Sequence, residues 1–221
     1  MGNRQNNSGN EEVFQLEITD ISMPIHSNMP VFRNAEEKKP VFHITRNFVN
    51  GNGARETRME LELHTGTHMD APLHMIEGGQ NSSFFKVEDM VLPCKALDFT
   101  DVEDGITEKD LQRKEIKAGD FILLKTKNSF QDGFCPDFIF VKESGARYLA
   151  QIGIRGVGID SLGIERSQAD HATHKALLGN GIYILEGLRL KDVEEGSYTL
   201  IAAPIYIMDV EAAPVRALLV R

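Results

Sequence analysis

Short apolar segments recur along the chain, and they constrain its fold more than any other feature. Each contains Ile, Leu, Val or aromatic residues in a short run, a pattern typical of β-strands. The segments are KALDFT (95–100), FILLKT (121–126), GVGID (156–160), IYILEGL (182–188), TLIAAPIYI (199–207) and VRALLV (215–220). VFQLEITD (13–20) alternates well enough to be an earlier strand. This succession predicts a β-rich protein.

Helical patterns are fewer and appear later in the chain. ITEKDLQRKEI (106–116) predicts a short helix with Thr107 as N-cap, and further helices are expected over about 143–151 and 171–181. The fold class is therefore mixed α/β or α+β. Neither a repeat nor a linker divides the chain, so residues 13–221 are expected to form a single domain, preceded by a flexible polar tail at 1–12.

Charge and cysteine content narrow the partners and the compartment. The chain of 221 residues has 24 Lys and Arg against 33 Asp and Glu, a formal net charge of −9, and no basic cluster. Nucleic acid and anionic membrane surfaces are therefore poor partners. Cys94 and Cys135 lack the spacing of a disulfide framework or a zinc site, and no signal peptide or membrane span is evident. A soluble cytoplasmic protein is expected.

The segment HTGTHMDAPLH (64–74) contains three of the seven histidines. A helix is disfavoured there by β-branched Thr65 and Thr67, by Gly66 and by Pro72. The preceding segment TRMELELH (57–64) alternates strictly, which predicts a half-buried strand with an apolar face and a polar face. The apolar face would carry Met59, Leu61 and Leu63, and the polar face Arg58, Glu60, Glu62 and His64. Glu60 or Glu62 is then a possible hydrogen-bond partner that orients the His64 ring.

The distance between His64 and Asp70 in an extended chain limits how the histidine segment can bind a metal. In a fully extended chain His64 and Asp70 would be separated by about 20 Å, too far for both to bind one ion. A metal site therefore requires a bend inside the motif, and Gly66 is the expected place. Imidazole with carboxylate and without cysteine suits zinc or manganese. His64, His68 and Asp70 would leave a coordination position open for water, as catalytic sites do.

Two downstream features could supply a second site. HATHKALL places His171 and His174 at the start of a predicted helix, and Glu186 lies in the apolar strand IYILEGL. A carboxylate in such a strand is costly unless a cation or metal pairs with it, or unless it reaches solvent at the strand end.

HTGTHMDAPLH resembles the His-x-Gly-Thr-His-x-Asp-x-Pro-x-His signature of the cyclase family, which includes bacterial-type kynurenine formamidases and isatin hydrolases. The resemblance continues at MPVF (29–32), AGDFILLKT, GVGIDSLGI, HKALLGNGIYILEGL and AAPVRALLV, over most of residues 15–221. It implies a barrel-like β core with peripheral helices, usually a homodimer, with one or two divalent ions, zinc first and manganese second.

The resemblance also implies the residue roles. His64, His68 and Asp70 would bind the first ion, and Asp70 would bridge to a second ion bound by His174 and Glu186. His74 would be the general acid/base, and its ordinary pKa near 6.5 suits proton transfer at neutral pH. His171 lies outside the family pattern and is expected to be an exposed helix residue. The implied activity is hydrolysis of an aryl formamide or cyclic amide by water that the ion activates, with kynurenine formamidase as the best single match.

Other functions stay open at this stage. Kynurenine formamidases usually have a tryptophan near the amino terminus that packs on the substrate, whereas this chain has none, and Phe32 or Phe42 would have to replace it. The alternatives are cyclisation or dehydration of a polyketide-like substrate and a non-catalytic metal-binding protein. A serine or cysteine hydrolase and a nucleotide-binding protein lack their sequence signatures.

Overall fold

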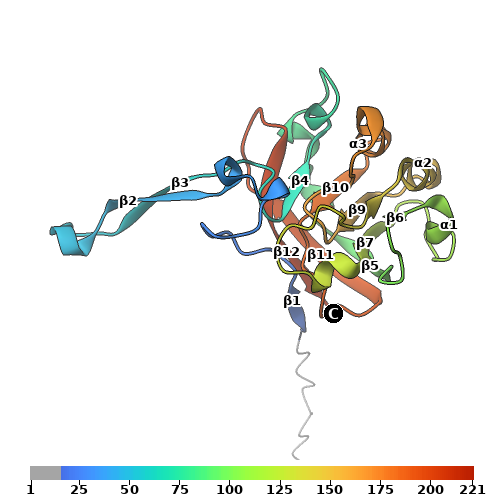
Figure 1. Ribbon diagram of the computed structural model, residues 1–221, viewed down its shortest axis with the longest axis horizontal. Helices are drawn as coiled ribbons and strands as arrows, with labels where there is room; N and C mark the ends of the chain where they lie inside the picture. Colours follow the sequence, from blue (N-terminus) through green and yellow to red (C-terminus); the bar gives the residue numbers. More distant parts are fainter. Residues whose placement is uncertain (1–15) are drawn as a thin grey trace, which may run out of the picture.

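The computed structural model describes residues 16–221. Seven strands form a closed barrel in the order β12-β11-β5-β7-β9-β10-β4, since β4 also pairs with β12, and β1 extends the sheet beside β12 (Figure 1). Their bounds are β1 Ile18–Asp20, β4 His68–Asp70, β5 Val91–Asp98, β7 Phe121–Lys125, β9 Gly156–Ile159, β10 Tyr183–Glu186, β11 Gly196–Pro204 and β12 Ala212–Val220. The β-rich, barrel-like α/β fold expected from the sequence is confirmed.

The apolar side chains of the barrel strands alternate between two cores. In β7, Leu123 packs in the cluster inside the barrel, whereas Ile122 and Leu124 pack in the cluster under the helices. All three are fully buried. Burial on both faces explains why these strands appear in the sequence as continuous apolar runs.

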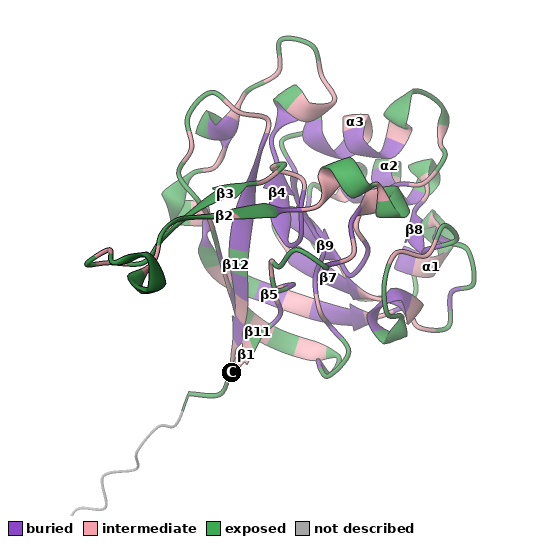
Figure 2. Cartoon of the chain, turned by 60° about the vertical axis from the view of Figure 1, so that its left-hand side comes forward, coloured by how far each residue is buried: buried purple, intermediate pink, exposed green. Residues whose placement is uncertain are grey.

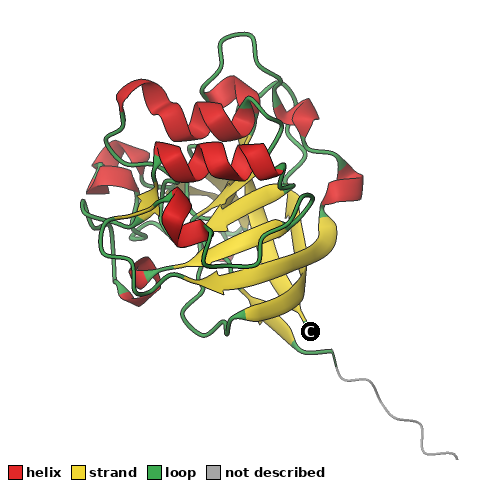
Figure 3. Cartoon of the chain, turned by 90° about the vertical axis from the view of Figure 1, so that its right-hand side faces the viewer, coloured by secondary structure: helices red, strands yellow, loops and turns green. Residues whose placement is uncertain are grey.

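Three helices pack against one side of the barrel (Figure 3). They are α1 Glu108–Leu111, α2 Glu143–Ile152 and α3 Ala172–Leu178, and a small parallel pair of strands, β6 Gly105–Ile106 and β8 Phe140–Val141, lies near α1. Thr107 caps α1 as expected, in a reciprocal capping box with Asp110. Ala146 and Leu149 of α2 are fully buried, so this helix anchors on the outer core.

A hairpin made of β2 Val41–Arg46 and β3 Glu56–Glu60 projects from the barrel as an arm (Figures 1 and 2). The expectation of a half-buried strand over 57–64 is wrong here, because β3 ends at Glu60 and all its residues are exposed. The physical reason is that the arm lies away from the barrel, so neither of its faces meets the core. Phe42 pairs with Met59 across the hairpin, and Ile44 lies on the same face, so the alternation survives as an uncovered apolar face.

Two further expectations lie partly or wholly outside the described residues. The predicted tail at 1–12 and the start of the strand at 13–20 belong to the part that is not described, and only β1 represents that strand. Within residues 16–221 no helix has the length and apolar character needed to cross a bilayer.

Candidate metal centre

The motif 64–74 bends as the reach estimate requires. Gly66 has a φ of 68°, and β4 begins two residues later at His68. Thr67 fixes the bend, since its Oγ1 accepts a hydrogen bond from Met23 N–H at 2.7 Å and donates to Gly187 O at 2.7 Å. The expected bend at Gly66 is confirmed.

A second glycine lets two chain segments meet at the bend. Gly187 has a φ of 70°, and a Cβ placed on it would lie 2.2 Å from Gly66 O. Only glycine permits this close approach of the two backbones. The approach stabilises the antiparallel register in which His68 lies opposite Glu186 and Asp70 opposite Ile184.

Asp70 lies at the centre of the resulting cluster and is fully buried. Its Oδ1 lies 3.0 Å from His64 Nδ1 and 3.5 Å from His68 Nε2. Its Oδ2 lies 3.6 Å from His174 Nε2. Glu186 completes the cluster, 3.3 Å from His68 Nε2 and 3.5 Å from His174 Nε2. The structure thus brings together all five residues expected to be metal ligands.

Several buried polar atoms of this cluster lack a hydrogen-bond partner within the described residues, namely both carboxylate oxygens of Asp70, Nε2 of His64 and His68, and Nδ1 of His174. His68 Nδ1 lies 3.0 Å from Gly66 O and donates there, so Nε2 is the ring nitrogen that faces the carboxylates and would bind an ion once its proton is displaced. Buried polar groups are normally paired. Converging imidazole nitrogens and carboxylate oxygens fit a borderline-hard divalent cation such as zinc or manganese.

The electrostatics of the cluster show the same need for positive charge. Burial raises the pKa of Asp70, but the contacts with His174 and His64 outweigh it and hold that pKa well below its usual range. Burial and Asp70 likewise raise the pKa of Glu186, and its His174 and His68 neighbours lower it to about 2. Burial disfavours charged His68, yet the Glu186 and Asp70 carboxylates raise the pKa of His68 to about 9. Protonated imidazoles therefore offset the carboxylate charge, a role that a divalent cation would also fill.

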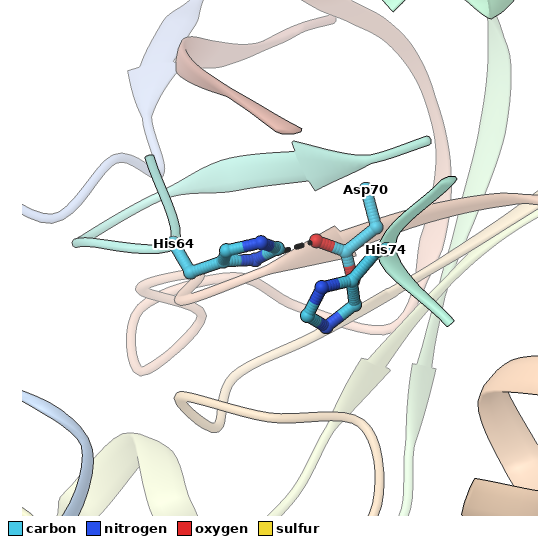
Figure 4. Close-up of side chains that lie close together, drawn as sticks. All are labelled: His64, Asp70 and His74. Atoms are coloured by element: carbon cyan, nitrogen blue, oxygen red, sulfur yellow. Dashed lines mark ion pairs between the residues drawn. The ribbon is translucent and has the colours of Figure 1, made fainter. Parts of the chain in front are cut away.

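His74 differs from the other histidines of the motif. It lies in the short 3-10 helix Pro72–His74, its ring centroid is 3.9 Å from that of His64, and its plane is tilted by 35° (Figure 4). Burial lowers its pKa to about 4, although Asp70 acts in the opposite direction. The sequence suggested an ordinary pKa near 6.5, and burial accounts for the difference. His74 is therefore a neutral imidazole at neutral pH.

A cavity of about 460 Å³ opens beside the cluster. Phe32, Met75 and Leu162 supply apolar lining, and Arg33 and Lys38 supply positive charge. Of the two phenylalanines considered as replacements for a substrate-packing tryptophan, Phe32 lines this cavity, whereas Phe42 lies on the arm.

Other expectations for the site need correction. Glu60 pairs with His43 at 3.0 Å and Glu62 with Lys38 at 3.0 Å, so neither orients His64. Glu60 lies at the end of β3 on the arm, away from the barrel, and Glu62 is held by its pair with Lys38. His64 instead faces Glu211, whose Oε1 lies 3.7 Å from Nε2.

Glu165 and Glu211 lie near the cluster, and the sequence did not predict them there. Glu165 contacts His171, with Nδ1 of His171 2.9 Å from Oε1 of Glu165. His171 itself is exposed, as expected, but it precedes α3. Glu165 and Glu211 carry no signal in the sequence that separates them from surface acids. Only the folded chain brings them to the cluster.

The closed barrel and its histidine–carboxylate cluster define a class of metal-binding α/β proteins. The family model described as putative cyclase matches residues 19–166, and the chain belongs to this cyclase family.

Relatives and solved structures resemble the chain over most of its length. The kynurenine formamidase of Sphingopyxis alaskensis is 32% identical, with 91% of this chain and 97% of the relative covered. A structure described as a potential metal-dependent hydrolase with cyclase activity is 49% identical, covers 93% of this chain and 98% of its own, and has a TM-score of 0.88. Isatin hydrolase A from Labrenzia aggregata, at 22% identity, a TM-score of 0.80 and 93% coverage of each chain, shares the fold.

Proposed function

We propose that this protein is a metal-dependent amidohydrolase that cleaves a small aryl formamide or cyclic amide. The observation that carries the proposal is Asp70, a fully buried carboxylate without a hydrogen-bond partner in the described chain, surrounded by imidazoles beside an open cavity. A site of this kind needs a cation, and the adjacent cavity gives a small substrate access to it.

The ligand assignment is the one that the family resemblance implies, and the closeness of these side chains to one another around Asp70 supports it. His64, His68 and Asp70 would bind a first ion, and His174 and Glu186 would bind a second ion that Asp70 bridges. Zinc is the preferred ion and manganese the second choice, because the donors are imidazole nitrogens and carboxylate oxygens. Support comes from the donor atoms of His68, Asp70 and Glu186, which lie within 4.8 Å of one another.

The reaction would divide between the ion and the residues of this chain. A divalent cation supplies a Lewis acid that makes water acidic near neutral pH and polarises a carbonyl oxygen. His74, neutral and at the cavity wall, accepts the proton of the attacking water and delivers it to the leaving nitrogen as the C–N bond breaks. Phe32 and Leu162 pack on the apolar part of the substrate and exclude bulk water from the reacting carbonyl.

N-formylkynurenine is the first substrate to test. The kynurenine formamidases among the relatives support this choice, while the absence of tryptophan leaves Phe32 as the aromatic wall. The test is turnover of N-formylkynurenine and isatin by the metal-loaded protein, with metal-stripped protein as control. Hydrolysis of one of them that requires the metal is expected. A metal-loaded protein that hydrolyses neither would refute the amide substrate class.

One observation favours a second candidate function, cyclisation or dehydration of a polyketide-like substrate. The 49% identical structure is described as having cyclase activity, and the family model is described as a cyclase. The same acid/base and metal groups would serve that reaction. Formation of a free amino group together with a carboxylate, on one product or as an amine and formate, occurs in amide hydrolysis and not in a cyclisation, and it distinguishes the two.

We also infer a homodimer in the cytoplasm. The arm exposes Phe42, Ile44 and Met59 on one face, and an isolated two-stranded hairpin is only marginally stable in water. Packing of that face on a second copy would cover it.

The free cysteines Cys94 and Cys135 suit a reducing compartment, and the net charge of −9 favours a small-molecule partner over nucleic acid or membrane.

A further inference from the structure

Glu165 is a buried carboxylate next to the cluster that the proposed mechanism does not use. Its side chain is 5% exposed, and it follows β9 on the loop that leads toward α3. Its Oε2 accepts the backbone N–H of His174 at 3.0 Å and lies 3.2 Å from His174 Nδ1. Its Oε1 lies 2.9 Å from His171 Nδ1. Both oxygens are therefore engaged with the beginning of α3.

These contacts determine how His174 presents its ring. Nδ1 faces Glu165, while Nε2 faces Asp70 at 3.6 Å and Glu186 at 3.5 Å. A carboxylate beside Nδ1 favours the tautomer with the proton on that nitrogen, which leaves the lone pair of Nε2 directed into the cluster. A carboxylate beside the second ring nitrogen orients a metal-ligating imidazole and raises its basicity.

The residue before Glu165 acts on the other expected ligand of the second ion. Ile164 N–H donates to Glu186 Oε1 at 2.5 Å. Ile164 thus contacts Glu186, and Glu165 contacts His174. Among the ion pairs and hydrogen bonds of residues 16–221, neither Ile164 nor Glu165 contacts His64. The loop therefore distinguishes the second ion position from the first.

We propose that Glu165 is a positioning residue that sets the affinity of the second divalent-ion position by fixing the tautomer and orientation of His174. The inference rests on the proposed two-ion centre. His171 contributes only through Glu165, as an outer contact at the cavity rim.

Calorimetric titration of the metal-stripped protein with Zn²⁺ tests the inference. Wild type is expected to bind two ions. Glu165→Ala should weaken the second by about 10- to 100-fold and leave the first within about threefold, since partners of this kind typically cost that much in metal affinity. Glu165→Gln keeps the volume and should weaken the second ion less, and His171→Ala less still. Glu115→Ala, an exposed acid that pairs with Lys117, is the matched control and should bind as wild type.

Nitrogen-15 NMR of the zinc-loaded protein gives a readout that a merely structural role would not change. The His174 ring, identified by its loss in His174→Ala, should show a zinc-bound Nε2 and a protonated Nδ1 in wild type, and in Glu165→Gln a fraction of rings that have left the ion and exchange between both tautomers. If Glu165→Ala unfolds, the test rests on Glu165→Gln, through its affinity for the second zinc ion and the tautomer of its His174 ring. A second-ion affinity and a His174 tautomer unchanged in the folded variants would overturn the inference and leave the proposed function intact. Wild type that binds a single ion would overturn the inference alone, and wild type that binds none would overturn both.

Discussion

Asp70 and His74 lie four residues apart, yet the structure favours the charged form of Asp70 and the neutral form of His74. Asp70 is fully buried among imidazoles that stabilise its charged form, whereas burial makes His74 a neutral base. Reach and residue type predicted a metal site within 64–74 and the bend at Gly66, and the family resemblance added His174 and Glu186 to that site. The lowered pKa of His74 and the contacts of Glu165 with His174 were not predictable, because both depend on segments distant in the chain.

Loss of the His74 imidazole should separate catalysis from metal binding. His74→Ala is expected to lower kcat by about 10²- to 10⁴-fold, the usual contribution of a positioned general acid/base, with unchanged zinc content. Steady-state kinetics and metal analysis of the same preparation make the measurement. His26→Ala, which removes an exposed histidine, is the control. Loss of zinc in His74→Ala would show that His74 is a ligand, and the role assignment would then be wrong.

Asp70→Ala is expected to have the opposite effect on metal content. Removal of the carboxylate that both ions would share should leave less than one ion per chain after dialysis, and activity should disappear with it. Elemental analysis of dialysed wild type and variant gives the answer, and circular dichroism reports whether the variant is folded. A folded Asp70→Ala protein with full zinc content would refute the ligand assignment.

At the scale of elements, the site depends on β4 and β10 meeting with Gly66 against Gly187. Periodicity located β10 in the sequence but not β4, because a strand as short as His68–Asp70 has no period to detect. The register between the two strands follows from a close backbone approach that involves residues more than a hundred positions apart. Sequence patterns carry no information about such contacts.

Gly187→Ala should therefore destabilise the fold strongly. The new Cβ would lie 2.2 Å from Gly66 O, and φ is 70°, so strain and overpacking together are expected to cost about 3–5 kcal/mol in the free energy of unfolding. Gly181→Ala is the matched control, since its φ is 71° and nothing lies within 4 Å of its Cβ, so about 1–2 kcal/mol is expected. Denaturant unfolding compares the two. Equal losses would mean that the Gly66–Gly187 approach does not constrain the fold.

In the whole molecule, the barrel buries its own apolar side chains, whereas the arm leaves an apolar face exposed. The strict alternation of residues 57–64 indicated an amphipathic strand, and the structure places its apolar residue Met59 beside Phe42 with no core to cover them. Alternation reports that one face needs covering, but it does not tell whether the same chain or another chain covers it. The prediction of a half-buried strand over residues 57–64 is wrong for this reason.

A charge on the apolar face of the arm should weaken the inferred dimer. Ile44→Lys is expected to shift the mass in solution toward the monomer and to raise the dimer dissociation constant at least tenfold. Thr45→Lys adds the same charge to a neighbouring exposed position and should leave the mass unchanged. Light scattering after size-exclusion chromatography measures both. A wild-type protein that is monomeric at micromolar concentration would contradict the inference.

Anomalous diffraction from crystals grown with zinc shows directly whether Asp70 lies at a divalent metal centre. We expect an anomalous peak above the zinc edge at bonding distance, about 2.0–2.2 Å, from Asp70 and His68. A zinc-grown crystal in which the map shows no peak between these two side chains would contradict it.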